Sequence, residues 1–229
     1  TEPILEQLQK DLHLLSLPKH IECFDNSNFQ GQYPVASMVV FKDGKASKKD
    51  YRHFKIKTVE GPNDFASMEE IVLRRYKRCI DENLPFPDLI IVDGGKGQLS
   101  SAAKSLEALG LLTKIPIIGI AKKLEEIYVL NDPIPLHLDK RSTSLKIIQQ
   151  LRNEAHRFGI TFHRDLRSKG TFVTHLTDLP GIGKGTASKL LSHFRSVKKV
   201  KEATLEQLVE VVGLSRAELI KKAIDDAAI

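Results

Sequence analysis

The chain has 229 residues, of which 41% are hydrophobic and 28% are charged. This composition is typical of a folded protein with a sizeable core and argues against a disordered chain. Apolar runs stay well below the roughly 18 residues of a membrane-spanning helix, and no segment resembles a signal peptide. The 35 Lys and Arg exceed the 29 Asp and Glu by six, which mildly favours a polyanionic partner such as nucleic acid.

Two features bear on the setting of the chain. Its two cysteines, Cys23 and Cys79, both lie in apolar segments and are too few for a disulfide framework. We therefore expect a reduced, cytoplasmic setting. The chain begins at Thr1, directly inside an amphipathic pattern, and we expect it to be a fragment of a longer protein.

The first elements predict a helix followed by antiparallel strands. The helix places four apolar side chains on one face, and Pro18 ends it: Ile4, Leu8, Leu12 and Leu15. Strands are expected over 21–24, ending at Asp25, and over 35–41. Asp43 and Gly44 favour a tight hairpin into a third strand over 51–58, because both positions tolerate a positive φ.

The next elements predict an α/β sheet. Ser67 and Glu70 are expected to form a capping box at the start of a helix that runs through Tyr76. Residues 89–92 are continuously apolar, as in a strand covered on both faces in a parallel part of a sheet. A helix over 98–109 and a buried strand over 116–121 follow. The expected fold class is α/β, with a mixed sheet and flanking helices.

A long helix is expected from Thr143 to about Arg167. Its apolar stripe is formed by Ile148, Leu151, Ala155, Phe158 and Phe162, and a polar stripe beside it by Gln149, Arg152, His156 and His163. Residues 167–170 have the composition of a linker, and short helices with glycine-rich turns follow. We expect a catalytic domain over 1–166, a linker over 167–174 and a small all-α domain over 175–229.

Two aspartates predict a metal site. Asp25 and Asp93 each end a predicted buried strand, at the sheet edge where open α/β sheets bind ligands. On parallel neighbouring strands, about 4.8 Å apart, both carboxylates would reach one hard cation. We expect Mg²⁺ or Mn²⁺, whose chemistry suits phosphodiester hydrolysis. Taken singly, each aspartate is an ordinary turn residue.

His156 borders the buried face of the long helix and is a candidate third group. As a neutral imidazole it would ligate the metal or accept a proton, and as an imidazolium it would stabilise phosphate charge. Because Mg²⁺ prefers oxygen, we favour proton transfer or phosphate positioning over direct ligation. A lone helix histidine is more often structural.

Three segments carry a specific resemblance: Phe24-Asp25-Asn26-Ser27, Val92-Asp93-Gly94-Gly95-Lys96-Gly97-Gln98 and Arg152-Asn153-Glu154-Ala155-His156-Arg157-Phe158. In this order and spacing the chain resembles UvrC, the incising subunit of bacterial nucleotide excision repair, over nearly its whole length. The resemblance implies an RNase H-like endonuclease that cuts 5′ to a DNA lesion. It further implies catalytic roles for Asp25, Asp93 and His156, and a role in incision for Asp64.

One position departs from the family. Many members carry Asp-Ile-Ser-His where this chain has Asp25-Asn26-Ser27-Asn28, so no histidine is available at position 28. Further basic side chains are candidates for phosphate contact, although a solvated basic face explains them equally well: Lys122, Lys123, Arg152, Arg157, His163 and Arg164.

The C-terminal pattern indicates a tandem helix-hairpin-helix domain. In the first copy, Gly181, Ile182, Gly183 and Lys184 form a turn whose backbone N–H groups approach a phosphate before a helix N-terminus. No acidic residue occurs between Lys184 and Lys201. A second copy is expected around Gly213, Leu214 and Ser215, with capping boxes at Thr204 with Gln207 and at Ser215 with Glu218. A module that binds only protein is the alternative.

The favoured function is therefore a metal-dependent endonuclease on damaged double-stranded DNA. One rival is a repair scaffold that binds DNA without cutting, and another is a resolvase or transposase on the same fold. The resemblance also implies UvrB as a partner, through a segment of the longer protein outside these residues.

Overall fold

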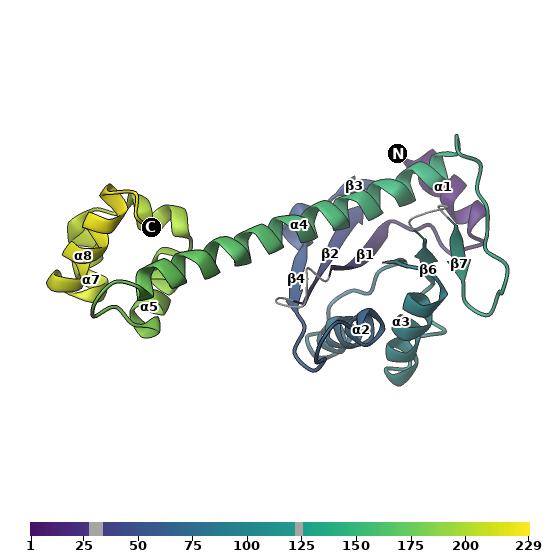
Figure 1. Ribbon diagram of the computed structural model, residues 1–229. Helices are drawn as coiled ribbons and strands as arrows, with labels where there is room; N and C mark the ends of the chain where they lie inside the picture. The colour runs from purple at the N-terminus through teal and green to yellow at the C-terminus, as the bar shows by residue number, and fades with distance from the viewer. Residues whose placement is uncertain (28–33, 122–125) are drawn as a thin grey trace. The chain divides into compact units, whose positions relative to one another are not determined.

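The computed structural model describes residues 1–27, 34–121 and 126–229 (Figure 1). The chain divides into two compact units, Thr1–His163 and Arg164–Ile229. Asn28, Lys122 and Lys123, which were named as expectations above, lie outside the described residues. Each unit is described by itself.

The first unit is built on a seven-stranded mixed sheet. Its strands are β1 (His20–Ser27), β2 (Val35–Lys42), β3 (Lys45–Ala46), β4 (Arg52–Lys55), β5 (Leu89–Asp93), β6 (Ile117–Ile120) and β7 (Ile127–Val129). The order is β3-β2-β1-β5-β6-β7, and β4 also pairs with β2. The strands β1, β5 and β6 are parallel, whereas β2 and β7 run antiparallel to their neighbours. The expected mixed α/β sheet is confirmed.

The hairpin expected after β2 is present. Asp43 and Gly44 both have positive φ, at 49° and 74°, as the tight turn requires. The turn leads first into the short β3, and β4 then pairs further along β2. The third strand is therefore shorter than expected.

Helices cover both faces of the sheet (Figure 1). On one face lie α2 (Asp64–Asp81) and α3 (Lys96–Ala108). On the other lie α1 (Glu2–Asp11) and the first part of α4 (Thr143–Thr177). Ser144 Oγ of α4 donates a hydrogen bond of 2.7 Å to Asp11 Oδ2 of α1. A 3₁₀ turn, η1 (Lys48–Asp50), precedes β4. The core lies between these layers and includes all of β5.

Two details of the N-terminal elements differ from expectation. The helix α1 ends at Asp11, so Leu15 lies beyond it and is fully exposed, while Leu5 and Leu8 are buried. The helix α2 begins earlier than expected because Asn63 caps it, its side chain accepting a hydrogen bond from the Ala66 N–H. The capping box at Ser67 and Glu70 is therefore wrong. Glu70 instead accepts hydrogen bonds from the backbone of the segment before the helix.

The long helix is longer than the sequence pattern indicated. Residues 167–174, expected to be a linker, are helical, because α4 continues to Thr177. Its final turns contribute Phe172 and Leu176 to the core of the second unit. This apolar burial explains why the polar run at 167–170 does not end the helix.

The second unit contains the end of α4 and four short helices: α5 (Lys184–Phe194), α6 (Val197–Glu202), α7 (Leu205–Val212) and α8 (Leu214–Asp225). The capping box of Thr204 and Gln207 at α7 is present as expected. The box expected at Ser215 and Glu218 is wrong, because α8 begins directly after Gly213 and has no side-chain cap. Within the described part of the chain, no helix is long and apolar enough to cross a membrane.

Candidate active site

Asp25 and Asp93 lie side by side at one edge of the sheet. The parallel strands β1 and β5 pair in register up to Phe24 opposite Val92, so the next residue on each strand is an aspartate. Because side chains alternate along a strand, both carboxylates point to the same face. They are 2% and 6% exposed. The structure thus brings the two residues together. Asp93 ends β5 as expected, whereas β1 continues past Asp25 to Ser27, because its last residues also pair with β2.

His156 meets this pair from the helix above. Its Nδ1 lies 3.2 Å from Oδ2 of Asp25, and its side chain is 49% exposed, so the ring stands at the solvent side of the buried carboxylate. An ionised carboxylate only accepts hydrogen bonds, which assigns the Nδ1 proton to this contact. The other ring nitrogen, Nε2, is then left to exchange a proton or to donate to a phosphate.

The position of His156 depends on contacts that hold α4 to the sheet. Ser37, the strand partner of Asp25, donates a buried hydrogen bond of 2.8 Å to the main-chain oxygen of Ala155. About one turn further along α4, the ring of Phe158 stacks on the ring of His53 from β4, with 3.7 Å between the ring centroids. The Nε2 atom of His53 lies 3.0 Å from the main-chain oxygen of Phe158. Sequence reasoning missed Ser37. Its signal was a hydroxyl within an otherwise apolar strand.

The charges of the site affect the pKa of the buried Cys23 thiol, which lies two residues before Asp25 on β1. Burial raises its pKa well above the ordinary value, and the negative charges of Asp93 and Asp25 raise it further, while Arg152 acts in the opposite direction. Both carboxylates and the guanidinium therefore lie close enough to one buried group to act on it. Arg152, expected to bind phosphate, donates hydrogen bonds of 3.3 and 3.4 Å to the side-chain oxygen of Asn153.

Asp64 lies near the pair but on another side of β1. It is the first residue of α2, and its main-chain oxygen accepts a hydrogen bond of 2.8 Å from the side chain of Asn26. Asn26 follows Asp25 and so points to the opposite face of the strand. Sequence reasoning missed this role of Asn26, whose signal was its place directly after Asp25.

The carboxylates do not form a larger ligand cluster. Across residues 1–27, 34–121 and 126–229, no group of three or more side chains of His, Cys, Asp or Glu is arranged so that it could hold a metal ion. The available donor set is therefore the pair Asp25 and Asp93. Two carboxylates suffice for Mg²⁺ or Mn²⁺ when waters and substrate phosphate complete the coordination.

Glycines keep the loop after Asp93 compact. A Cβ atom at Gly94 would lie 2.2 Å from Cγ of Gln98, and one at Gly119 would lie 2.8 Å from the main-chain oxygen of Gly94. The second contact is with backbone, which cannot move aside cheaply. Gly119 on β6 therefore allows the close approach that holds the end of β5 in place.

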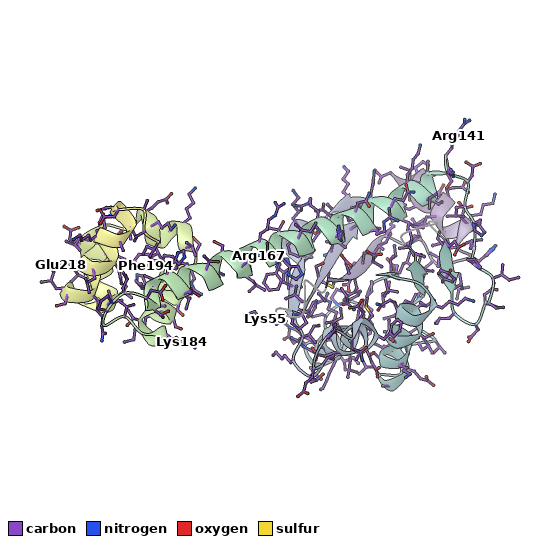
Figure 2. All side chains as sticks on the ribbon, in the orientation of Figure 1. Lys55, Arg141, Arg167, Lys184, Phe194 and Glu218 are labelled. Carbon is purple, nitrogen blue, oxygen red and sulfur yellow. The ribbon has the colours of Figure 1, made fainter. Side chains whose placement is uncertain are left out.

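The first hairpin turn of the second unit has the expected geometry. Gly181 has a φ of 79°, Gly183 is the N-cap of α5, and Lys184 is its first residue. Ile182 is buried in the core of this unit, which fixes the turn, whereas its neighbours are exposed. Figure 2 shows Lys184 at the surface of the second unit.

The second turn is built differently. Gly213 alone, with a φ of 85°, joins α7 to α8. Leu214, which stands where the first turn has the buried Ile182, is exposed, as is Ser215, and this turn is held from its other side by the partly buried Val212.

The remaining basic candidates are in different situations. Arg157 forms two hydrogen bonds, of 2.7 and 2.8 Å, with the carboxylate of Glu154. His163 is buried, so the expected phosphate contact does not fit its position. Arg164 lies in the second unit, where it lines a shallow groove with Arg167, His175 and Lys201.

Comparison with known proteins agrees with this architecture. Residues 9–160 match the UvrC RNAse H endonuclease domain, and residues 173–226 match the SAM-like helix-hairpin-helix tandem. The UvrABC system protein C of Flavobacterium johnsoniae is 64% identical over 222 residues, which cover 97% of this chain and 37% of that protein. The protein of the same name from Porphyromonas gingivalis is 60% identical over 221 residues, covering 96% of this chain and 37% of that protein.

The chain thus spans little more than a third of the length of these relatives. Among solved structures, Endonuclease_V from Bacillus subtilis matches 70% of this chain and 91% of that chain, with 13% identity and a TM-score of 0.38. This likeness is too low to support a conclusion about function.

Proposed function

Because the chain belongs to the family of UvrC RNase H endonuclease domains, we propose that it hydrolyses a phosphodiester bond of damaged double-stranded DNA. The proposed cut is the incision 5′ to the lesion in bacterial nucleotide excision repair. The observation that carries this proposal is the register of β1 and β5, which places two buried carboxylates on one face with His156 beside them.

Asp25 and Asp93 are the residues proposed to hold the metal. Their four oxygens are hard donors, and Mg²⁺ and Mn²⁺ both accept such donors together with phosphate and water. Two like charges on adjacent buried residues repel one another, so a divalent cation would also stabilise the folded pair. When bound, the ion supplies a polarised phosphoryl oxygen and a water of lowered pKa.

His156 is proposed to move a proton or to position phosphate. Its Nδ1 faces Asp25, so ligation through this nitrogen would cost the hydrogen bond that orients the ring. The exposed edge of the ring is available to a substrate at the sheet edge. Arg152 lies one turn before His156 on α4, and its guanidinium is proposed to offset the charge of the bound phosphate.

The second unit is proposed to hold the DNA backbone. Two exposed glycines and the N-terminus of α5 allow the first turn to present backbone N–H groups to a phosphate. The second turn, with its exposed Leu214 and Ser215, is a proposed second contact. Arg157 and Arg164 are also proposed phosphate contacts. UvrB is proposed as a protein partner of the longer protein.

A nicking assay tests the central proposal. The 229-residue chain is incubated with a lesion-containing duplex and with Mg²⁺, Mn²⁺ or EDTA, and the wild type is compared with Asp25→Ala and Asp93→Ala. We expect metal-dependent nicks 5′ to the lesion that both substitutions abolish while DNA affinity is retained. Asp81→Ala, which removes an exposed carboxylate of α2, is the matched control. Normal nicking by the Asp25 or Asp93 variant would exclude the proposed site.

The same chain can be tested for metal binding without activity. By mass action, Mg²⁺ or Mn²⁺ should increase the free energy of unfolding of the wild type by about 3 kcal/mol at a hundredfold excess over Kd, and so raise its thermal midpoint. This rise should be absent in the Asp25 and Asp93 variants. DNA binding by the wild type without any cutting would instead favour a repair scaffold. Cutting of unmodified DNA junctions as fast as of the lesion-containing duplex would favour a resolvase.

A further inference from the structure

An exposed aromatic ring lies at the start of α2, the helix that Asn26 contacts next to Asp25. Phe65 is the second residue of α2, next to Asp64, and it is 55% exposed. Single exposed apolar residues are common on protein surfaces, so exposure alone does not indicate function. The contacts that fix this ring carry the argument.

The Phe65 ring rests edge-on against the backbone of α3. A Cβ atom at Gly97 would lie 2.4 Å from Cε1 and 2.6 Å from Cζ of this ring. Only a glycine leaves space for the ring at this point. Gly97 is itself exposed, in the first turn of the helix that follows Asp93. At this point the ring contacts an exposed glycine, and more than half of the Phe65 residue is exposed to solvent.

The backbone that carries Phe65 is anchored to the same strand end as Asp25. Asn26 donates a hydrogen bond of 2.8 Å to the Asp64 oxygen, and Asn63 caps the helix through the Ala66 N–H. Phe65 lies between these two contacts. Its backbone is thus held to β1 near Asp25, and its ring contacts Gly97 in the segment that follows Asp93.

We propose that Phe65 is a stacking platform for a nucleobase next to the phosphodiester bond that is cut. This inference deepens the proposed function and rests on it. Nucleobases stack on aromatic rings with little regard for sequence, because every base has a π face. An exposed ring that is held between Asn26, directly after Asp25, and Gly97, in the segment after Asp93, suits a base that leaves the duplex stack when its phosphate enters the site. Such stacking also fits an enzyme that must cut beside lesions of varied sequence context.

The test uses 2-aminopurine, a fluorescent adenine analogue, placed at single positions around the expected cut. The protein carries Asp25→Asn, which keeps the substrate intact, and is compared with and without Phe65→Ala. We expect a fluorescence change at one position beside the cut phosphate that Phe65→Ala removes and Phe65→Trp restores. We also expect about tenfold weaker DNA binding for Phe65→Ala, from the usual strength of base stacking. Phe86→Ala, which removes a partly exposed phenylalanine away from these contacts, is the matched control.

A double-substitution cycle tests whether the ring position matters. Gly97→Ala should displace the Phe65 ring and weaken binding, and it should have no further effect once Phe65 is alanine. Unchanged fluorescence and affinity in Phe65→Ala would overturn the platform. If the wild type nicks DNA in that case, the proposed function stands and only the platform fails. If the fluorescence change depends on Phe65 but the wild type never cuts DNA, the platform stands and the proposed hydrolysis is refuted. Absence of DNA binding by the wild type would overturn both.

Discussion

Ser37 donates a buried hydrogen bond of 2.8 Å to the main-chain oxygen of Ala155. Ser37 is paired with Asp25 across β1 and β2, and Ala155 directly precedes His156. This bond therefore sets the distance between helix and strand at the point where His156 meets Asp25. It makes Ser37 a positioning residue for the candidate site.

The first prediction concerns this bond. Ser37→Ala should lower the cutting rate and shift its pH profile, because His156 loses its fixed distance from Asp25. Loss of the bond should cost about 1 kcal/mol of stability. Ser105→Ala is the control, since Ser105 donates a comparable bond of 2.6 Å to the Glu69 oxygen within the same unit. A Ser37 variant that lost only stability, with the pH profile of the wild type, would exclude a positioning role.

His156 is expected to affect the rate of cutting but not metal binding. His156→Ala should reduce the single-turnover rate by about 10²-fold to 10⁴-fold, the usual contribution of a positioned proton-transfer group. Because Asp25 and Asp93 supply the proposed ligands, Mn²⁺ affinity measured by calorimetry should be nearly unchanged. A large loss of Mn²⁺ affinity, with cutting restored at high metal concentration, would identify His156 as a ligand instead.

Lys184 is expected to contribute to DNA affinity through phosphate contact at the first hairpin turn. Lys184→Ala should weaken binding about equally for all sequences, and the slope of log affinity against log salt should fall by about 1. Lys77→Ala, an exposed lysine of α2, is the control for total charge. An unchanged salt slope would place the DNA contact elsewhere.

Glu70 is expected to make the first unit sensitive to acid. Burial opposes its ionisation, but hydrogen bonds from the Thr58 side chain and from the backbone of Thr58 and Lys57, with Arg74, outweigh burial and lower its pKa below the ordinary 4.5. A lowered pKa contributes stability that is fully present above 4.5 and is lost as the pH falls through the lowered value.

Urea unfolding of Glu70→Gln measures this contribution. Near neutral pH the variant should be about 1–3 kcal/mol less stable than the wild type, because a charged acceptor is removed from several donors. The difference should shrink in acid. Glu69→Gln changes an exposed neighbour and should have little effect at either pH. A difference for Glu70→Gln that did not depend on pH would contradict the assignment.

The sequence by itself was sufficient for features that depend on local patterns. The continuous apolar run of β5, the Asp43-Gly44 turn and the Thr204 capping box each lie within a few residues of chain, so their side chains reveal them directly. The end of β5 at Asp93 also followed from local pattern, whereas β1 continues two residues past its expected end at Asp25, to Ser27. The resemblance of three motifs to one family then indicated the fold class.

Only the tertiary structure decided the geometry of the site. The contact of His156 with Asp25 joins residues 131 positions apart, and the Ser37 bond to Ala155 joins residues 118 apart. A local sequence pattern spans only a few residues and so gives no information on contacts between residues this far apart in the chain. The same reason explains two errors. Burial of Phe172 and Leu176 continues α4 through a polar run. Glu70 does not cap its helix, because its carboxylate accepts hydrogen bonds from the N–H groups of Lys57 and Thr58 instead. In the first case packing, and in the second hydrogen bonds to backbone 12 and 13 residues away, outweighed a local preference of about 1 kcal/mol.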